Sequence, residues 1–316
     1  MAATVLITTA HGMFGGALLQ QLRLRPELQV RGMVRRRRAD DVDAGNVRWV
    51  EGDLDDPASL IAVVQGVSEV FLTTPMDGRI AARECALIDA LKVHSPQARV
   101  VILYGAVDHQ GDPLVTQHQQ AIAHLQASGL RWTILSPNTV METALLLQAV
   151  SVPWGVVMGC SGEGRVGFVA LDDVVRVAAT VLACGGFEGE ELVVTGPEAL
   201  SMPHVCRLLS LELGRPVRFL DLPEERLAAM LLEDGSYGSA QQVETEVLCH
   251  LRAWRRGGAA IVTDTVARVS GRQPLSVAAW LQEQRAVFAR PRRVQDHLIG
   301  LLLRLRFGRF ALDPTA

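Results

Sequence analysis

The stretch TVLITTAHGMFGG, from Thr4 to Gly16, decides how the rest of the chain is read. A short apolar run ends at Thr8 and meets a glycine-rich turn, and a helical pattern of apolar residues follows from Ala17 to Leu24. A buried strand that leads through a glycine turn into a helix suits a pyrophosphate, because the first amides of the helix point at the ligand and the helix dipole favours its negative charge. The stretch therefore predicts a dinucleotide site.

Length and composition indicate a globular protein. With 316 residues, of which 49% are hydrophobic, the chain can bury a full core, which fits one large domain or a domain with an added lobe. A formal net charge of -3 argues against a broad surface for nucleic acid. Lys92 is the only lysine, which excludes a catalytic lysine elsewhere. The five cysteines show no metal-ligand or redox spacing, so we expect reduced thiols and no metal site.

The N-terminal residues lack the basic region and apolar core of a signal peptide. No apolar run reaches the roughly eighteen residues that a membrane span needs. We therefore expect a cytoplasmic protein without a membrane span.

Five further apolar runs predict parallel strands, and helical patterns separate them. Each run is mostly apolar, as in a sheet that is covered on both faces. The alternation predicts an α/β fold, a doubly wound parallel sheet of the Rossmann type, over residues 1–152. The five runs are Leu28 to Val34, Val47 to Glu51, Glu69 to Thr73, Arg99 to Leu103 and Leu130 to Leu135.

Beyond about residue 150 the alternation ends. Glycine-rich Pro153 to Gly167 predicts a loop, and Val166 to Leu171 and Glu191 to Thr195 predict strands, so that 166–195 returns to the sheet. Amphipathic helical patterns then predict a smaller, mostly helical lobe over 153–290 that closes over the cofactor edge and carries substrate specificity. These patterns cover Ser201 to Leu213, Glu224 to Glu233, Ala240 to Arg256 and Ser276 to Phe288.

The tail, residues 291–316, contains the apolar, arginine-bearing stretch HLIGLLLRLRFGRF from His297 to Phe310. This pattern suits a helix packed on its own chain or between two copies, and it also suits a membrane surface. The chain is thus expected to be a monomer or a homodimer.

Arginines follow the second predicted strand, from Arg35 to Arg38. NAD-selective sites place an acidic side chain there for the ribose hydroxyls, whereas arginine accommodates a 2'-phosphate. Arg35 and Arg36 therefore favour NADP(H) as cofactor. The alternative is a solvated arginine cluster.

Other candidate contacts follow the ends of later strands, where open parallel sheets bind ligands. Asp53 and Leu54 follow the third strand, and Asp53 suits either an adenine amino group or, with its acidic neighbours, the cap of the next helix. The remaining candidates, after the fourth and sixth strands, are Thr73, Thr74, Pro75 and Asn138.

Several motifs in order resemble the NmrA-like group of atypical short-chain dehydrogenase/reductase proteins over roughly residues 4 to 290. The resemblance implies that the turn binds NADP(H), through Thr9, His11, Gly12, Met13, Phe14 and Gly15. It does not imply one reaction, since members include reductases, quinone reductases, redox-sensing regulators and inactive proteins. The motifs are TTAHGMFG, VFLTTP, SGLRWTILSPN followed by Met141 and Glu142, FVALDDVVRVAATVL, ELVVTGPEALS, LGRPV and GRQPLSVAAWL.

The glycine turn departs from the usual family pattern TGATGxxG. Thr9 replaces the first glycine and His11 replaces a threonine. A left-handed backbone at Thr9 would cost about 1 to 2 kcal/mol, which corresponds to a roughly five- to thirty-fold loss of affinity. We therefore expect this turn to bind the cofactor more weakly than the usual family turn. His11 either donates to a phosphate or fills the groove.

The usual tyrosine and lysine pair of short-chain dehydrogenases is absent, because neither tyrosine has a lysine four residues later. NmrA-like proteins usually lack that pair too. Tyr104 and His118 are the candidates for donating a proton to a developing alkoxide, and Asp108 and His109 lie between them. Family members commonly have a histidine near position 118; the alternative is a solvent-exposed histidine at a helix terminus.

Three functions fit these observations. The first is an NADP(H)-dependent reductase of a hydrophobic carbonyl, enone or quinone-type small molecule, with hydride transfer from nicotinamide. The second is a non-catalytic protein that senses the NADP(H) redox state. The third is a cofactor-independent cyclase or isomerase in which Thr9 and His11 have closed the old site.

Overall fold

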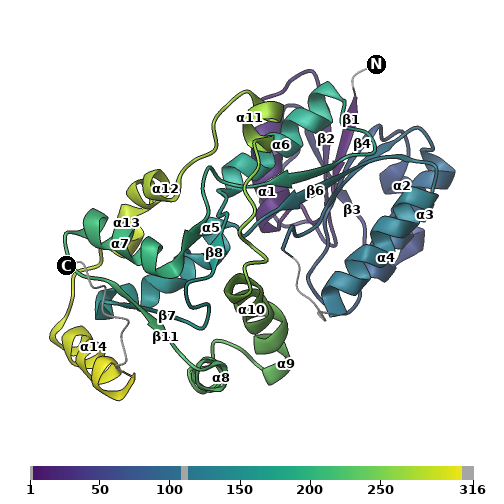
Figure 1. The fold of residues 1–316 in the computed structure, drawn as a ribbon. Coiled ribbons are helices and arrows are strands. Elements are labelled where there is room, and N and C mark those ends of the chain that lie inside the picture. The colour runs from purple at the N-terminus through teal and green to yellow at the C-terminus, as the bar shows by residue number, and fades with distance from the viewer. Residues whose placement is uncertain (1–2, 108–112, 308–316) are drawn as a thin grey trace.

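The computed structural model describes residues 3–107 and 113–307. Its centre is a seven-stranded sheet in the order β3-β2-β1-β4-β5-β6-β9 (Figure 1). Every neighbouring pair in this sheet is parallel. The strands are β1 (Thr4–Ile7), β2 (Gln29–Val34), β3 (Val47–Glu51), β4 (Glu69–Leu72), β5 (Arg99–Leu103), β6 (Arg131–Pro137) and β9 (Glu191–Val194). The predicted doubly wound sheet is confirmed.

The strand order reverses at β1. The chain adds β2 and β3 on one side of β1 and then crosses to add β4, β5 and β6 on the other side. The loops after β1 and β4 diverge at such a point, which is where open α/β sheets bind ligands. The glycine turn thus lies at the switch point of the sheet.

Helices cover both faces of the sheet, as the apolar strands require. On one face, α1 (Met13–Leu22) packs with α6 (Leu171–Cys184), and α11 (Thr265–Ser270) packs on α6. On the other face lie α2 (Pro57–Val64), α3 (Ile80–His94) and α4 (Pro113–Ala127), with α3 between the other two. Figure 1 shows the two layers on either side of the strands.

The second half of the chain builds a lobe around a separate apolar core. Two short sheets lie there, a parallel pair of β7 (Val156–Gly159) with β11 (Arg218–Asp221) and an antiparallel pair of β8 (Arg165–Val166) with β10 (Leu200–Ser201). The lobe helices are α5 (Met141–Ala144), α7 (Met202–Leu213), α8 (Glu224–Glu233), α9 (Ala240–Val243), α10 (Cys249–Arg255), α12 (Val277–Glu283), α13 (Arg285–Phe288) and α14 (Val294–Phe307), with short turns at Leu146–Val150, Val152–Trp154 and Glu244–Leu248.

Two predictions for the start of the lobe were wrong. The expected loop over 153–167 contains β7. Of the expected strand over 166–171, only Val166 lies in a named strand, the two-residue β8. The turn at Gly155, with φ of +80°, leads into β7, whose partner β11 comes much later in the chain. Local pattern does not reveal such a distant pairing.

Glu142 fastens the lobe to the sheet. One carboxylate oxygen accepts a hydrogen bond from Leu171 N at 2.9 Å, and the other accepts one from Trp280 Nε1 at 3.0 Å. The residue thereby joins the start of α6 to α12. Within residues 3–107 and 113–307, no helix is long and apolar enough to cross a membrane.

Candidate cofactor and active site

The turn after β1 brings the amino end of α1 to the carboxyl edge of the sheet. Thr8 N donates to Phe71 O at 3.1 Å, and Gly12 N donates to Thr9 O at 2.7 Å. Thr9 has a φ of +46°, in the left-handed region that favours glycine. The backbone strain that the sequence suggested at this position is therefore present.

Gly15 allows α1 to approach this turn closely. A Cβ at position 15 would lie 2.5 Å from Thr9 O and 3.0 Å from Thr8 O. Both atoms belong to the backbone and cannot rotate away. Any side chain at this position would push the helix off the turn.

Among residues 3–107 and 113–307, no side chain caps the amino end of α1. Its N-cap residue, Gly12, has an extended backbone, and the first turn contains no acidic residue. Met13 is 39% exposed, whereas Phe14 packs partly into the core. The first amides of the helix therefore carry its positive end without an anionic side chain, which fits a pyrophosphate.

His11 pairs with an acidic residue that the sequence analysis missed. Its Nε2 lies 2.7 Å from Asp41 Oδ1, and Asp41 Oδ2 accepts from Arg38 N at 2.7 Å. Burial alone would raise the pKa of Asp41, but the hydrogen bonds from Arg38 N and His11 outweigh it and lower that pKa. His11 also lies against Trp49, with ring centroids 5.2 Å apart. The histidine thus joins the glycine turn to the loop after β2.

The arginines after β2 divide into two kinds. Arg37 is committed to its own loop, because its guanidinium donates to Asp41 O at 2.6 Å and to Asp43 Oδ1 at 3.2 Å. Arg35 and Arg36 are exposed, and neither has a hydrogen bond or ion pair among the described residues. These two guanidinium groups are available to an anion beside the switch point.

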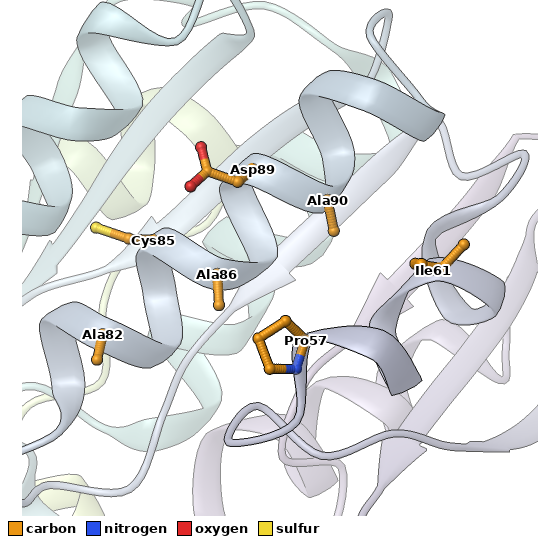
Figure 2. A pocket seen from close by; sticks show the side chains of 7 residues that line it. All are labelled: Pro57, Ile61, Ala82, Cys85, Ala86, Asp89 and Ala90. Carbon is orange, nitrogen blue, oxygen red and sulfur yellow. The ribbon is translucent and has the colours of Figure 1, made fainter.

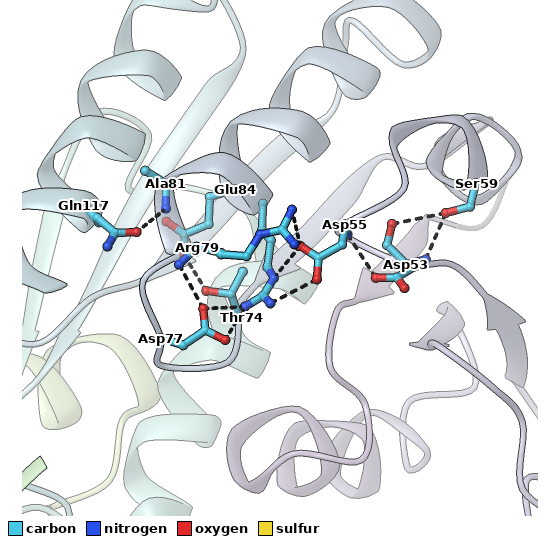
Figure 3. Close-up of polar contacts among 10 residues, drawn as sticks. Asp53, Asp55, Ser59, Thr74, Asp77, Arg79, Ala81, Glu84 and Gln117 are labelled. Atoms are coloured by element: carbon cyan, nitrogen blue, oxygen red, sulfur yellow. Dashed lines mark hydrogen bonds and ion pairs between the residues drawn. The ribbon is translucent and has the colours of Figure 1, made fainter. Parts of the chain in front are cut away.

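Asp53 stabilises the loop after β3. Its carboxylate accepts from Asp55 N at 2.9 Å, and its own amide donates to Ser59 Oγ at 2.9 Å (Figure 3). Asp56, not Asp53, caps α2, by accepting from Ala58 N. Leu54 is buried in the core beneath this loop. Whether Asp53 also meets an adenine stays a prediction.

An arginine locks the loops after β3 and β4 together. Arg83 donates from Nε to Asp55 at 2.8 Å and from its terminal nitrogen to Asp77 at 2.8 Å. Arg79, which Figure 3 shows beside Asp55, lies 3.2 Å from that carboxylate. The hydrogen bond from Arg83 is the largest cause that holds the pKa of Asp55 below its ordinary value. The network fixes the edge on which the site is built.

Thr73, Thr74 and Pro75 continue β4 at the same edge. Thr73 N donates to Thr8 Oγ1 at 2.8 Å, and that hydroxyl donates back to Thr73 O at 2.6 Å, which joins the ends of β1 and β4. Thr74 is buried and donates from Oγ1 to Glu84 at 3.2 Å, whereas Pro75 is exposed. The three residues border the switch point, and their contact with the cofactor stays a prediction.

Tyr104 and His118 meet at the end of β5. Their rings lie edge to face with centroids 5.5 Å apart. The alternative of an exposed histidine at a helix terminus is wrong, because His118 is 8% exposed and lies in the second turn of α4. The structure thus brings the two candidate proton donors together, while Asp108 and His109 lie outside the described residues.

Asn138 is engaged with the lobe. Its side-chain nitrogen donates to Ala259 O at 2.9 Å, and its side-chain oxygen accepts from Thr139 N at 2.7 Å. The residue is 3% exposed. Its predicted contact with the cofactor stays a prediction, and its evident task is to hold the segment around residue 259 against the end of β6.

A shallow groove of about 400 Å³ lies between α2 and α3, on the outside of the helical layer (Figure 2). None of the residues predicted to bind the cofactor or donate a proton lines it. The groove is lined by Pro57, Ile61, Ala82, Cys85, Ala86, Asp89 and Ala90.

Comparison with known proteins agrees with this geometry. A family model described as NAD(P)H-binding matches residues 9–183, from the strained turn to the end of α6. An NAD(P)H azoreductase from Xenophilus azovorans is 28% identical over 290 residues, which cover 90% of this chain and 99% of the azoreductase.

Two solved structures have the same fold. The NADPH-dependent quinone oxidoreductase of Escherichia coli, complexed with NADPH, has a TM-score of 0.81 at 22% identity, covering 89% of this chain and 99% of its own. The triphenylmethane reductase of Citrobacter sp., complexed with NADP(H), has a TM-score of 0.78 at 19% identity with the same coverage.

Proposed function

Because the chain belongs to the NAD(P)H-binding family, we propose that it is an NADP(H)-dependent reductase of a hydrophobic carbonyl, enone or quinone-type small molecule. The observation that carries the proposal is the uncapped amino end of α1, which Gly15 lets approach the turn after β1. The azoreductase similar over nearly the whole chain supports a redox reaction on an organic acceptor.

Each part of the edge has a separate task in this proposal. The first-turn amides of α1 hold the pyrophosphate, and Arg35 and Arg36 hold a 2'-phosphate, which favours NADP(H) over NAD(H). NADPH supplies a hydride when bound. Tyr104 and His118 face the acceptor and supply the proton.

A calorimetric titration with NADPH, NADP⁺ and NADH tests cofactor binding, and oxidation of NADPH with a panel of quinones, enones and ketones tests turnover. We expect NADPH to bind more tightly than NADH and to be oxidised by at least one acceptor class. Tight binding without turnover would favour the redox sensor instead. Absence of binding would favour the cofactor-independent enzyme.

Two glycines of the turn provide a matched pair of variants. Gly15→Ala places a Cβ 2.5 Å from a backbone oxygen, and we expect it to reduce NADPH affinity at least tenfold or to destabilise the fold. Gly16→Ala places a Cβ 3.4 Å from Ala10 O, close to ordinary contact, and we expect near-normal binding. Equal affinities in the two variants would argue against a pyrophosphate at this turn.

A further inference from the structure

Glu84 of α3 and His118 of α4 form a buried ionisable pair, and apolar packing between the two helices does not account for it. Glu84 is 0% exposed and its Oε2 lies 3.6 Å from His118 Nδ1. Within the described residues, both atoms are fully buried and neither has a hydrogen-bond partner. A buried polar atom without a partner lowers the free energy of unfolding by about 1 to 3 kcal/mol, so a purely structural contact of this kind would destabilise the fold.

The pair lies under the edge at which the reductase would act. Glu84 Oε1 accepts from Thr74 Oγ1 at 3.2 Å, and Thr74 follows β4 (Figure 3). His118 lies edge to face with Tyr104, which follows the neighbouring strand β5. Glu84 is thus fixed on the sheet side by Thr74 and faces the candidate proton donor on the other.

We propose that Glu84 is a positioning residue, which accepts a hydrogen bond from Nδ1–H of His118 and so turns the other ring nitrogen, Nε2, towards the substrate. The proposal rests on the proposed reductase function. The hydrogen bond at one ring nitrogen of a histidine decides the tautomer and the task of the other. A separation of 3.6 Å suits this role, since catalytic hydrogen bonds are often long before the substrate binds.

When bound, NADPH would supply a hydride, that is two electrons and one hydrogen nucleus, and negative charge would develop on the substrate oxygen. The Nε2–H bond of the His118 imidazolium breaks, its electron pair stays on Nε2, and the proton forms the new O–H bond. The neutral ring that results keeps its Nδ1 proton directed at Glu84, and Nε2 regains a proton from solvent.

The same two helices provide a matched control. Asp89 of α3 and His124 of α4 form a second carboxylate and imidazole pair, with Nε2 of His124 2.8 Å from Asp89 Oδ1. This pair is exposed, with side-chain exposures of 35% for His124 and 58% for Asp89. Asp89→Leu therefore removes a like contact away from the proposed site.

Nitrogen-15 spectra of the imidazole rings test the positioning role in the cofactor-free protein. His118 is assigned among the eight histidines by its loss in His118→Asn. We expect neutral His118 to carry its proton on Nδ1 in the wild type and on Nε2 in Glu84→Leu, with no change in Asp89→Leu. A wild-type ring protonated on Nε2 alone would overturn the proposal, even if Glu84→Leu failed to fold.

Steady-state kinetics supply the second test. We expect Glu84→Leu to lower kcat about ten- to a hundredfold with KM within about twofold, and Asp89→Leu to leave both unchanged. A folded Glu84→Leu with wild-type kcat would refute the role of Glu84 in an active reductase. Failure of the wild type to oxidise NADPH would refute the proposed function instead, while the spectra would still decide whether Glu84 sets the tautomer.

Discussion

Substitution of Thr9 can show whether the strained backbone at this position lowers the stability of the fold or the affinity for the cofactor. Its φ of +46° costs a side chain with a Cβ about 1 to 2 kcal/mol. Thr9→Gly removes this cost but adds about 0.5 to 1 kcal/mol of backbone entropy to the unfolded chain. The net gain of about 0.5 to 1 kcal/mol corresponds to a rise in Tm of about 1 to 1.5 °C for a chain of this length.

The Thr9→Gly substitution should change the affinity for the cofactor very little. The turn is held by contacts inside the fold, Ala10 N to Met33 O at 3.0 Å and Gly12 N to Thr9 O at 2.7 Å. The strain is therefore paid on folding and is shared by the free and bound states. We expect the Kd for NADPH to change less than about twofold, instead of the five- to thirty-fold that the sequence suggested.

Differential scanning calorimetry and calorimetric titration measure the two quantities on the same samples. Thr9→Ala is the control, because it loses the branched side chain but keeps the Cβ, so it should gain little in Tm. A Thr9→Gly variant that bound NADPH more than five times as tightly, without a rise in Tm, would refute the reasoning. Such a result would mean that Thr9 adopts its strained backbone only when the cofactor binds.

Two further predictions concern the loop after β2. Replacing Arg35 and Arg36 together by serine should weaken NADPH binding about tenfold or more, while binding of NADH, measured by the same titration, should change little. Asp41→Asn should lower the Tm near neutral pH. Because the pKa of Asp41 is lowered in the folded state, its stabilisation is present above the unfolded value of about 3.9 and is lost as the pH falls through the folded pKa. The difference in Tm between wild type and variant should therefore narrow below about pH 4 and not at higher pH.

Short segments of the amino-acid sequence were enough to predict the parallel sheet and the place of the glycine turn within it. The strands at Val47–Glu51 and Arg99–Leu103 match their predicted bounds, and the others differ by one or two residues at an end. Fully buried strands are apolar along their whole length, and a glycine turn must follow the first of them, so both features are written in short segments. Tyr104 and His118 were named as candidates through the family resemblance, and the structure brings their ring centroids to 5.5 Å.

The contacts of the polar residues at the carboxyl edge of the sheet depend on how the whole chain folds. Asp41 meets His11 across 30 residues of sequence, and Asn138 reaches Ala259 across 121. No local pattern singled out Glu84, yet its carboxylate lies 3.6 Å from His118 in the folded chain. Hydropathy at helical spacing places a helix against the sheet, but the choice of partner depends on how separate loops pack at one edge. That choice is made by contacts between distant segments, which a local pattern does not contain.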